Sequence, residues 1–161
     1  FGSQVDTLIN AVAMGKSVTF PRPSYDGRWL LYSYADFGCF PINHKEADLW
    51  LMDLQDGSTH PLERANSSYC ESFHNWSSDS HWLLFASRRG DSLYSRIYIV
   101  QIDENGNASK PFLLPQKDPD FYHKTLFTFN VPDFTSEKVN FRIRGAYEEA
   151  FSDERVQVTV K

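Results

Sequence analysis

The sequence predicts an all-β protein: a β-propeller fragment of two four-stranded antiparallel blades, a partial third blade and a short C-terminal helix and strand. Three observations lead to this fold class. A segment of the chain is duplicated, short apolar runs alternate with turn residues, and aromatic residues make up 16% of the chain. Aromatic and β-branched residues are enriched in strands, and short strands between turn signals are typical of all-β folds.

The duplication is the main signal. Residues Phe20–Leu31 align with Phe73–Leu84, 53 residues later, and six of the twelve pairs are identical. Leu49–Leu54 then aligns with Ile97–Ile102, 48 residues later, because the first copy has the longer loop. Repeats of this period are typical of propeller blades and solenoids. The residues predicted to define the structural repeat are Asp26, Gly27, Trp29, Asp79 and Trp82.

Each copy divides into four strands joined by turns. In the first copy we expect an inner strand ending at Phe20, a turn at Ser24–Gly27, strands Trp29–Ala35 and Asp48–Leu54, a turn at Gln55–Gly57 and a strand Thr59–Leu62. In the second we expect an inner strand ending at Phe73, a turn at Ser77–Ser80, strands Trp82–Ser87 and Arg96–Ile102, a turn at Glu104–Gly106 and a strand Lys110–Leu114. Asp and Gly favour such turns, because Asp bonds its own backbone and Gly tolerates positive φ.

The whole chain is predicted to be one propeller-type module, with blades at 17–63 and 70–115 and a partial blade with a C-terminal extension at 121–161. Nearly continuous apolar strands such as Trp29–Tyr32 indicate sheets covered on both faces. Phe129–Asp133 could begin another inner strand, Gly145–Ser152 favours helical turns, and Arg155–Lys161 alternates as a final strand. Val5–Met14 fits either a strand or a short helix.

Composition and charge narrow the function classes. The net charge of -5 gives no electrostatic footprint for nucleic acid, so no nucleic-acid partner is expected. No apolar run approaches the roughly 20 residues of a membrane span. No signal peptide is seen, and Phe1 is not a native start, so we expect a processed form or a piece of a longer protein. Cys39 and Cys70 are either buried thiols or a single disulfide.

Catalytic and cofactor motifs are missing from the sequence, so we expect a protein that is not an enzyme and has no cofactor. There is no Gly-x-Ser-x-Gly segment. Cys70 and His74 have loose metal-ligand spacing, but on a strand they would lie too far apart to share one ion, so no metal site is predicted. The acidic residues, including Glu71, are interpreted mostly as solvated surface.

One group of residues is a candidate partner-binding site. His74 and Trp76 alternate with Ser72 on one face of the second inner strand, and Arg88 and Arg89 end the next strand. Inner strands and their loops line the mouth of a propeller channel, where His, Trp and Arg could bind a peptide or an anionic group. The alternative is that Trp76 packs between blades and the arginines are solvated.

The segments Ser24–Ser33 and Ala47–Gly57 resemble the TolB-type propeller repeat, a WD40-like repeat of bacterial proteins. The second copy departs from that pattern, with Ser78 for Pro and Ser80 for Gly. The stretches around Asn75–Ser80, Ser87–Asp91 and Lys110–Pro115 are similar to a subgroup of bacterial TolB-like proteins. This resemblance implies a periplasmic or cell-envelope location, a missing N-terminal portion and no chemistry.

Three functions are therefore open. The first is a non-catalytic binding or scaffold module of the bacterial envelope that contacts a protein partner through loops at one rim. The second is a propeller accessory domain of a prolyl-oligopeptidase-type peptidase, which would need a hydrolase domain elsewhere. The third is self-association through open blade faces, since two blades and a part of a third cannot close a ring of four to eight.

Overall fold

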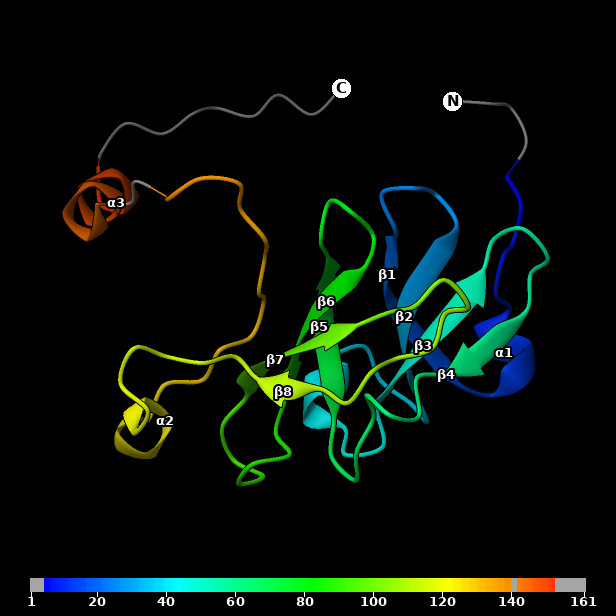
Figure 1. The fold of residues 1–161 in the computed structure, drawn as a ribbon, viewed down its shortest axis with the longest axis horizontal. Coiled ribbons are helices and arrows are strands. Elements are labelled where there is room, and N and C mark those ends of the chain that lie inside the picture. The colour runs from blue at the N-terminus through cyan, green and yellow to red at the C-terminus, as the bar shows by residue number, and fades with distance from the viewer. Residues whose placement is uncertain (1–4, 140–141, 153–161) are drawn as a thin grey trace.

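The computed structural model describes residues 5–139 and 142–152, and two four-stranded antiparallel sheets form its body (Figure 1). The first sheet holds β1 (Ser17–Pro23), β2 (Trp29–Ala35), β3 (Asp48–Asp53) and β4 (Thr59–Pro61). The second holds β5 (Glu71–Trp76), β6 (Trp82–Ser87), β7 (Arg96–Gln101) and β8 (Phe112–Leu113). Neighbouring strands pair in chain order in both sheets, so the predicted all-β fold of two four-stranded meanders is confirmed.

The two inner strands run three residues further than predicted. Each contains a β-bulge: the pairing register shifts between Thr19 and Arg22 in β1, and between the equivalent residues of β5. Phe20 and Phe73 lie in these bulges with φ angles of 53° and 48°. A bulge inserts an extra residue and lets the strand continue beyond it. The two phenyl rings meet edge to face across the sheets, with centroids 5.0 Å apart.

The same hydrogen-bonded turn opens β2 and β6. In the first copy, the Ser24 hydroxyl donates to the Asp26 carboxylate at 2.5 Å and accepts from the Trp29 N–H at 2.9 Å. The Asp26 carboxylate also accepts from the Arg28 N–H at 3.1 Å. In the second copy, Ser77, Asp79, His81 and Trp82 repeat these contacts. The Ser24 hydrogen bond is the main reason that the pKa of Asp26 is lowered.

Ser80 explains one departure from the repeat pattern. It stands where the first copy has Gly27, and it adopts the same left-handed conformation, with φ of 61° against 73°. Its hydroxyl accepts the N–H of Asp26 at 3.0 Å. The residue that breaks the repeat therefore links the two turns across the sheets.

The core lies between the two sheets. One face of β2 and β3 packs against one face of β5, β6 and β7, and buried large side chains fill the space. This core contains Trp29, Leu31, Leu49, Leu51, Leu62, Ala65, Trp76, Leu83, Phe85, Tyr98, Val100, Ile102 and Ala108. Complete burial of one such large side chain contributes about 1.5–3 kcal/mol, so this layer is the main source of stability for the pair.

The turn at Gly106 belongs to the second sheet but closes the core of the first. Gly106 has a φ of 78°, and a Cβ there would lie 2.8 Å from Trp29 Cη2 and 3.1 Å from Leu51 Cδ2. Trp29 is thereby buried. Trp82, its repeat equivalent, is only partly buried, and no third sheet covers it within the described residues.

Short segments cover the outer faces of the sheets. Ile9, just before α1 (Ala11–Met14), packs against the far face of the first sheet. Beyond β8, the chain includes α2 (Phe121–Lys124), and Phe129 and Phe134 pack against the far face of the second sheet. Arg96 anchors this segment by donating to the Phe127 carbonyl at 2.5 Å and the Tyr122 carbonyl at 3.2 Å.

The chain after β8 differs from its predicted structure. Phe129–Asp133 forms no strand. One backbone hydrogen bond, from the Phe129 N–H to the Ser95 carbonyl, ties this segment to the second sheet. Pro132 has no N–H to donate to a neighbouring strand. The helix predicted at Gly145–Ser152 is present as α3 (Ile143–Ala150). The strand predicted at Arg155–Lys161 lies outside the described residues.

The two repeat-equivalent turn glycines test the cross-sheet packing. Gly106→Ala should lower the free energy of unfolding by about 1–3 kcal/mol more than Gly57→Ala, because the added methyl meets the packed Trp29 ring. Gly57 has the same left-handed backbone, with φ of 76°, but nothing lies within 4 Å of its added Cβ. Urea denaturation of both variants measures the difference, and equal losses would contradict the cross-sheet contact.

Candidate functional site

Three loops gather at one end of the two sheets. Strands β2, β4 and β6 all end there, so the connections 36–47, 62–70 and 88–95 lie together along the lower edge in Figure 1. We call these three connections the rim. The first of them contains the short 3-10 helix η1 (Pro41–Asn43). The repeated turns lie at the opposite end of the sheets. The two copies differ most at the rim, because their loops there differ in length and sequence.

A pocket of about 380 Å³ opens between the three rim loops. We call it the rim pocket, and every loop contributes to its lining. The lining residues are Ile42, Asn43, Lys45, Tyr69, Cys70, Arg88 and Ser92. Two of them are cations, and the Lys45 ammonium lies 5.1 Å from the centre of the Tyr69 ring, within range of a cation–π contact.

Large apolar side chains are also exposed on the rim. Phe37 is 65% exposed, Phe40 61% and Leu93 69%. The ring of Phe37 packs edge to face on His44, with centroids 4.6 Å apart. Exposed aromatic side chains beside a pocket are a common feature of surfaces that bind other proteins.

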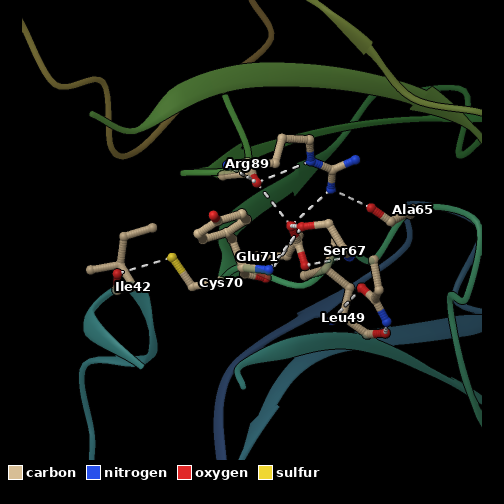
Figure 2. Close-up of polar contacts among 10 residues, drawn as sticks. Ile42, Leu49, Ala65, Ser67, Cys70, Glu71 and Arg89 are labelled. Atoms are coloured by element: carbon tan, nitrogen blue, oxygen red, sulfur yellow. Dashed lines mark hydrogen bonds and ion pairs between the residues drawn. The ribbon is translucent and has the colours of Figure 1, made fainter. Parts of the chain in front are cut away.

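A buried carboxylate holds the base of the rim together (Figure 2). Glu71, the first residue of β5, is fully buried, and its Oε1 accepts hydrogen bonds from Ser67 Oγ at 2.6 Å, Ser87 Oγ at 2.8 Å and Arg89 Nη2 at 2.9 Å. Its Oε2 accepts the Ser67 N–H at 3.0 Å. These bonds join the loop before β5 to the end of β6.

Arg89 completes this arrangement. Its guanidinium also donates to the Ala65 carbonyl and to Ser87 Oγ, and it lies 5.3 Å from the ring centre of Phe85 and 4.7 Å from that of Tyr98. A buried ion pair is tolerated when hydrogen bonds satisfy both partners, as they do here. The rim loops are thereby attached to the core between the sheets.

Loop 62–70 is fixed a second time through Asn66. Its side-chain amide accepts the Leu49 N–H at 2.9 Å and donates to the Leu49 carbonyl at 3.0 Å. Asn66 therefore pairs with the edge of β3 as a strand residue would. Three consecutive residues in the middle of the loop, Ala65, Asn66 and Ser67, are thus held by side-chain hydrogen bonds.

Two titratable groups beside this base have shifted pKa values. Burial and the charge of Glu71 raise the pKa of Asp48 to about 6. Burial raises the pKa of the Cys70 thiol, whose Sγ donates to the Ile42 carbonyl at 3.1 Å. Cys70 is buried and Cys39 is exposed, and both are free.

The structure separates the four predicted partner-binding residues into two places. His74 and Trp76 are buried between the sheets, where His74 Nε2 donates to the Phe20 carbonyl at 2.7 Å and Trp76 Nε1 to the Arg22 carbonyl at 3.0 Å. Arg88 lines the rim pocket and Arg89 binds Glu71. Partner binding by this set stays a prediction.

Sequence reasoning missed Glu71, the residue that holds the base of the rim together. Glu71 belongs to the acidic residues that were interpreted mostly as solvated surface, but it is buried, and Arg89, Ser87 and Ser67 bond its carboxylate inside the protein. A cation at the end of a buried strand was the available signal, since an arginine beside the core needs a carboxylate or carbonyl partner. No sequence pattern indicated that Lys45 and Tyr69, which lie in two of the rim loops, would line a pocket.

The part of the chain that the structure describes shows neither a metal site nor a membrane-spanning helix. Within it, no group of three or more His, Cys, Asp or Glu side chains is placed to hold a metal ion. None of the helices in the same residues has the length and apolar character needed to cross a bilayer.

Comparisons with known proteins find little. No family model matches the chain, and no curated protein matches it. A structure from a structural and mechanistic study of two prolyl endopeptidases matches 70% of this chain, with 16% sequence identity and a TM-score of 0.33. The match covers 23% of that structure's own chain. A similarity at this level carries no inference about function.

The buried ion pair should respond unequally to the loss of its two partners. Arg89→Met should lower the free energy of unfolding by about 3–5 kcal/mol, because it leaves the Glu71 carboxylate buried without its cation. Glu71→Gln should cost less, because the Arg89 side chain is 18% exposed and can reach water. Chemical denaturation measures both.

Arg144→Met is the control for that pair. Arg144 forms an exposed ion pair with Glu148, so its loss should change stability by less than about 1 kcal/mol. If Arg89→Met behaved like Arg144→Met, the ion pair would not hold the rim.

His74 should make stability depend on pH. Burial lowers its pKa to about 4, against 6.5 for an ordinary histidine. Between pH 6.5 and 4 the unfolded chain binds a proton at His74 that the folded chain does not, so the contribution of His74 to the free energy of unfolding falls as pH falls, by up to about 3 kcal/mol. The raised pKa of Asp48 contributes in the opposite direction over this range.

Urea denaturation at pH 7 and pH 4.5 measures this effect. His74→Gln should reduce the difference between the two pH values, whereas His81→Gln, at an exposed position in the repeated turn, should leave it unchanged. An unchanged difference in His74→Gln would show that the imidazole is not the titrating group.

Proposed function

We propose that this chain is a non-catalytic binding module that contacts a partner protein through the rim. The observation that carries the proposal is the combination, at one end of the sheets, of exposed apolar side chains, a pocket and a rigid base. The exposed side chains are those of Phe37, Phe40 and Leu93. The rim pocket lies between the same loops that carry them.

The composition of the rim fits a protein interface. Aromatic residues and Arg are enriched in the centres of interfaces, and a few such anchors supply most of the binding energy. Phe37 and Phe40 would supply apolar anchors, and Arg88 with Lys45 would supply polar contacts within the pocket. Phe37, Phe40 and Leu93 lie on two loops that form one pocket, and this grouping of exposed apolar side chains favours binding as their role.

The supporting structure also fits this role. Loops that bind partners are best held on a rigid scaffold, because less conformational entropy is then lost on binding. The Glu71–Arg89 ion pair and the Asn66 side chain fix the middle of the loop before β5, toward β6 and toward β3. The rim loops therefore rest on the same core that holds the sheets together.

The cellular setting of the proposal comes from the sequence resemblance. The repeat segments resemble those of TolB-type propellers, and we propose on that basis that the two sheets are blades of such a propeller in the bacterial cell envelope. The meander topology, with one sheet for each repeat, supports the blade assignment.

The rim side chains provide the test. A triple variant, Phe37→Ser, Phe40→Ser and Leu93→Ser, should weaken binding of an envelope partner by at least about 100-fold, since it removes the apolar anchors. The partner is captured with the immobilised chain from an envelope extract, identified by mass spectrometry, purified and titrated by calorimetry against each variant.

The matched control removes equally exposed apolar side chains elsewhere. Val12→Ser, Val131→Ser and Val139→Ser change positions that are 91%, 67% and 64% exposed and lie outside the three rim loops. This variant should bind within about threefold of the original chain. Equal losses in both triple variants, or a partner insensitive to the rim variant, would contradict the proposal.

A further inference from the structure

The rim pocket has an uneven charge. Lys45 and Arg88 line it, and no carboxylate does. Neither cation forms an ion pair within the described residues, whereas Lys16, Arg28 and Arg96 all do. The two cations of the pocket are therefore available to a ligand.

No carboxylate forms an ion pair with Lys45 or Arg88 within the described residues, and three nearby carboxylates have other partners. Glu71 binds Arg89, Asp91 lies 3.7 Å from Arg96, and Glu46 lies 3.5 Å from His44. Lys45 also faces the neighbouring depression that Glu46 and Asp48 line. Arg88 is thus the cation of the rim pocket with fewer carboxylates beside it, and we expect it to attract an anionic ligand more than Lys45 does.

Arg88 is also short of hydrogen-bond acceptors. One donor, Nη2, reaches the Asn43 side-chain oxygen at 3.3 Å, and Nε is buried without any acceptor. A buried donor on a charged group is costly to leave unpaired. A guanidinium presents a planar fork of donors that matches the two oxygens of a carboxylate. A carboxylate bound at the terminal guanidinium nitrogens of Arg88 would supply acceptors and the missing negative charge.

The walls of the pocket favour a side chain or chain end over a free ion. Ile42 and Tyr69 supply apolar surface, and Asn43 and Ser92 supply hydrogen-bonding groups. A volume of about 380 Å³ is at the small end of ligand sites, and it can hold one side chain with its neighbouring peptide groups. The exposed side chains of Phe37 and Leu93 lie on two of the loops that form the pocket.

We propose that the rim pocket binds a carboxylate presented by an acidic peptide segment, with Arg88 as the principal contact and Lys45 as a second cation. The proposal rests on the proposed function, since the peptide segment would belong to the partner protein. It assigns the pocket to the acidic part of the partner and the exposed apolar side chains to the apolar part.

The test uses the full chain and a defined probe. The probe is an N-acetylated, C-amidated hexapeptide that alternates glutamate and tyrosine, and its counterpart has glutamine for each glutamate. Binding is followed by NMR through the Nε–H signal of Arg88 and the backbone amides of the rim. The acidic peptide should shift these signals in a saturable way, and the glutamine peptide should not.

Matched variants locate the effect. Arg88→Gln should weaken binding of the acidic peptide at least tenfold. Arg64→Gln, which removes the same charge from an exposed position in a rim loop that does not line the pocket, should change binding less than twofold. Circular dichroism of both variants establishes that the fold is retained.

Separate arms distinguish the sources of the anion. N-acetylglutamate should shift the same signals but bind more weakly than the peptide, because it lacks the neighbouring residues. Inorganic phosphate that bound as tightly as the acidic peptide would overturn the proposal, and so would equal losses in Arg88→Gln and Arg64→Gln.

The outcome is separable from that of the proposed function. If the acidic peptide fails to bind while the Phe37, Phe40 and Leu93 variant still abolishes partner binding, the rim is an interface but the pocket is not its carboxylate site. If the peptide binds and the rim variant has no effect on the partner, the pocket stands alone as a binding site.

Discussion

The packing of one sheet against the other is the contact on which everything else in this protein depends. Apolar burial supplies most of the stability, but it has no direction and would tolerate sliding of the sheets. Direction comes from polar groups. His74 and Trp76 donate to carbonyls of the bulged strand β1, and Ser80 accepts from the turn at Asp26. These bonds satisfy backbone groups of one sheet with side chains of the other, so the two can meet in one register.

This contact places the two copies of the repeat in unequal surroundings. Trp29 is closed over by the Gly106 turn of the next sheet, whereas Trp82 faces no third sheet within the described residues. Gly27 needs only its turn conformation, while Ser80 uses the same conformation and also provides a cross-sheet bond. The two copies therefore use equivalent positions differently, according to the neighbour that each copy has.

Sequence reasoning found the elements whose signals are local. Strands β2 and β6 were predicted with their observed bounds, because the Ser-x-Asp turn fixes where each begins. The inner strands were predicted to end early, since a phenylalanine with positive φ at a bulge leaves no mark in residue type. Glu71 was missed for a different reason. Its burial depends on Arg89, eighteen positions away, and only the fold brings the two together.

The rim shows how a repeated scaffold can carry a single function. The copies match best over the turns at one end of the sheets, where the same serine and aspartate bonds recur. They differ at the other end, where the connection 36–47 is longer than its counterpart 88–95. The ion pair between Glu71 and Arg89 attaches loops 62–70 and 88–95 to the core between the sheets. A loop can then change its side chains without disturbing the sheets, so the rim is the part of this fold that is most free to specialise.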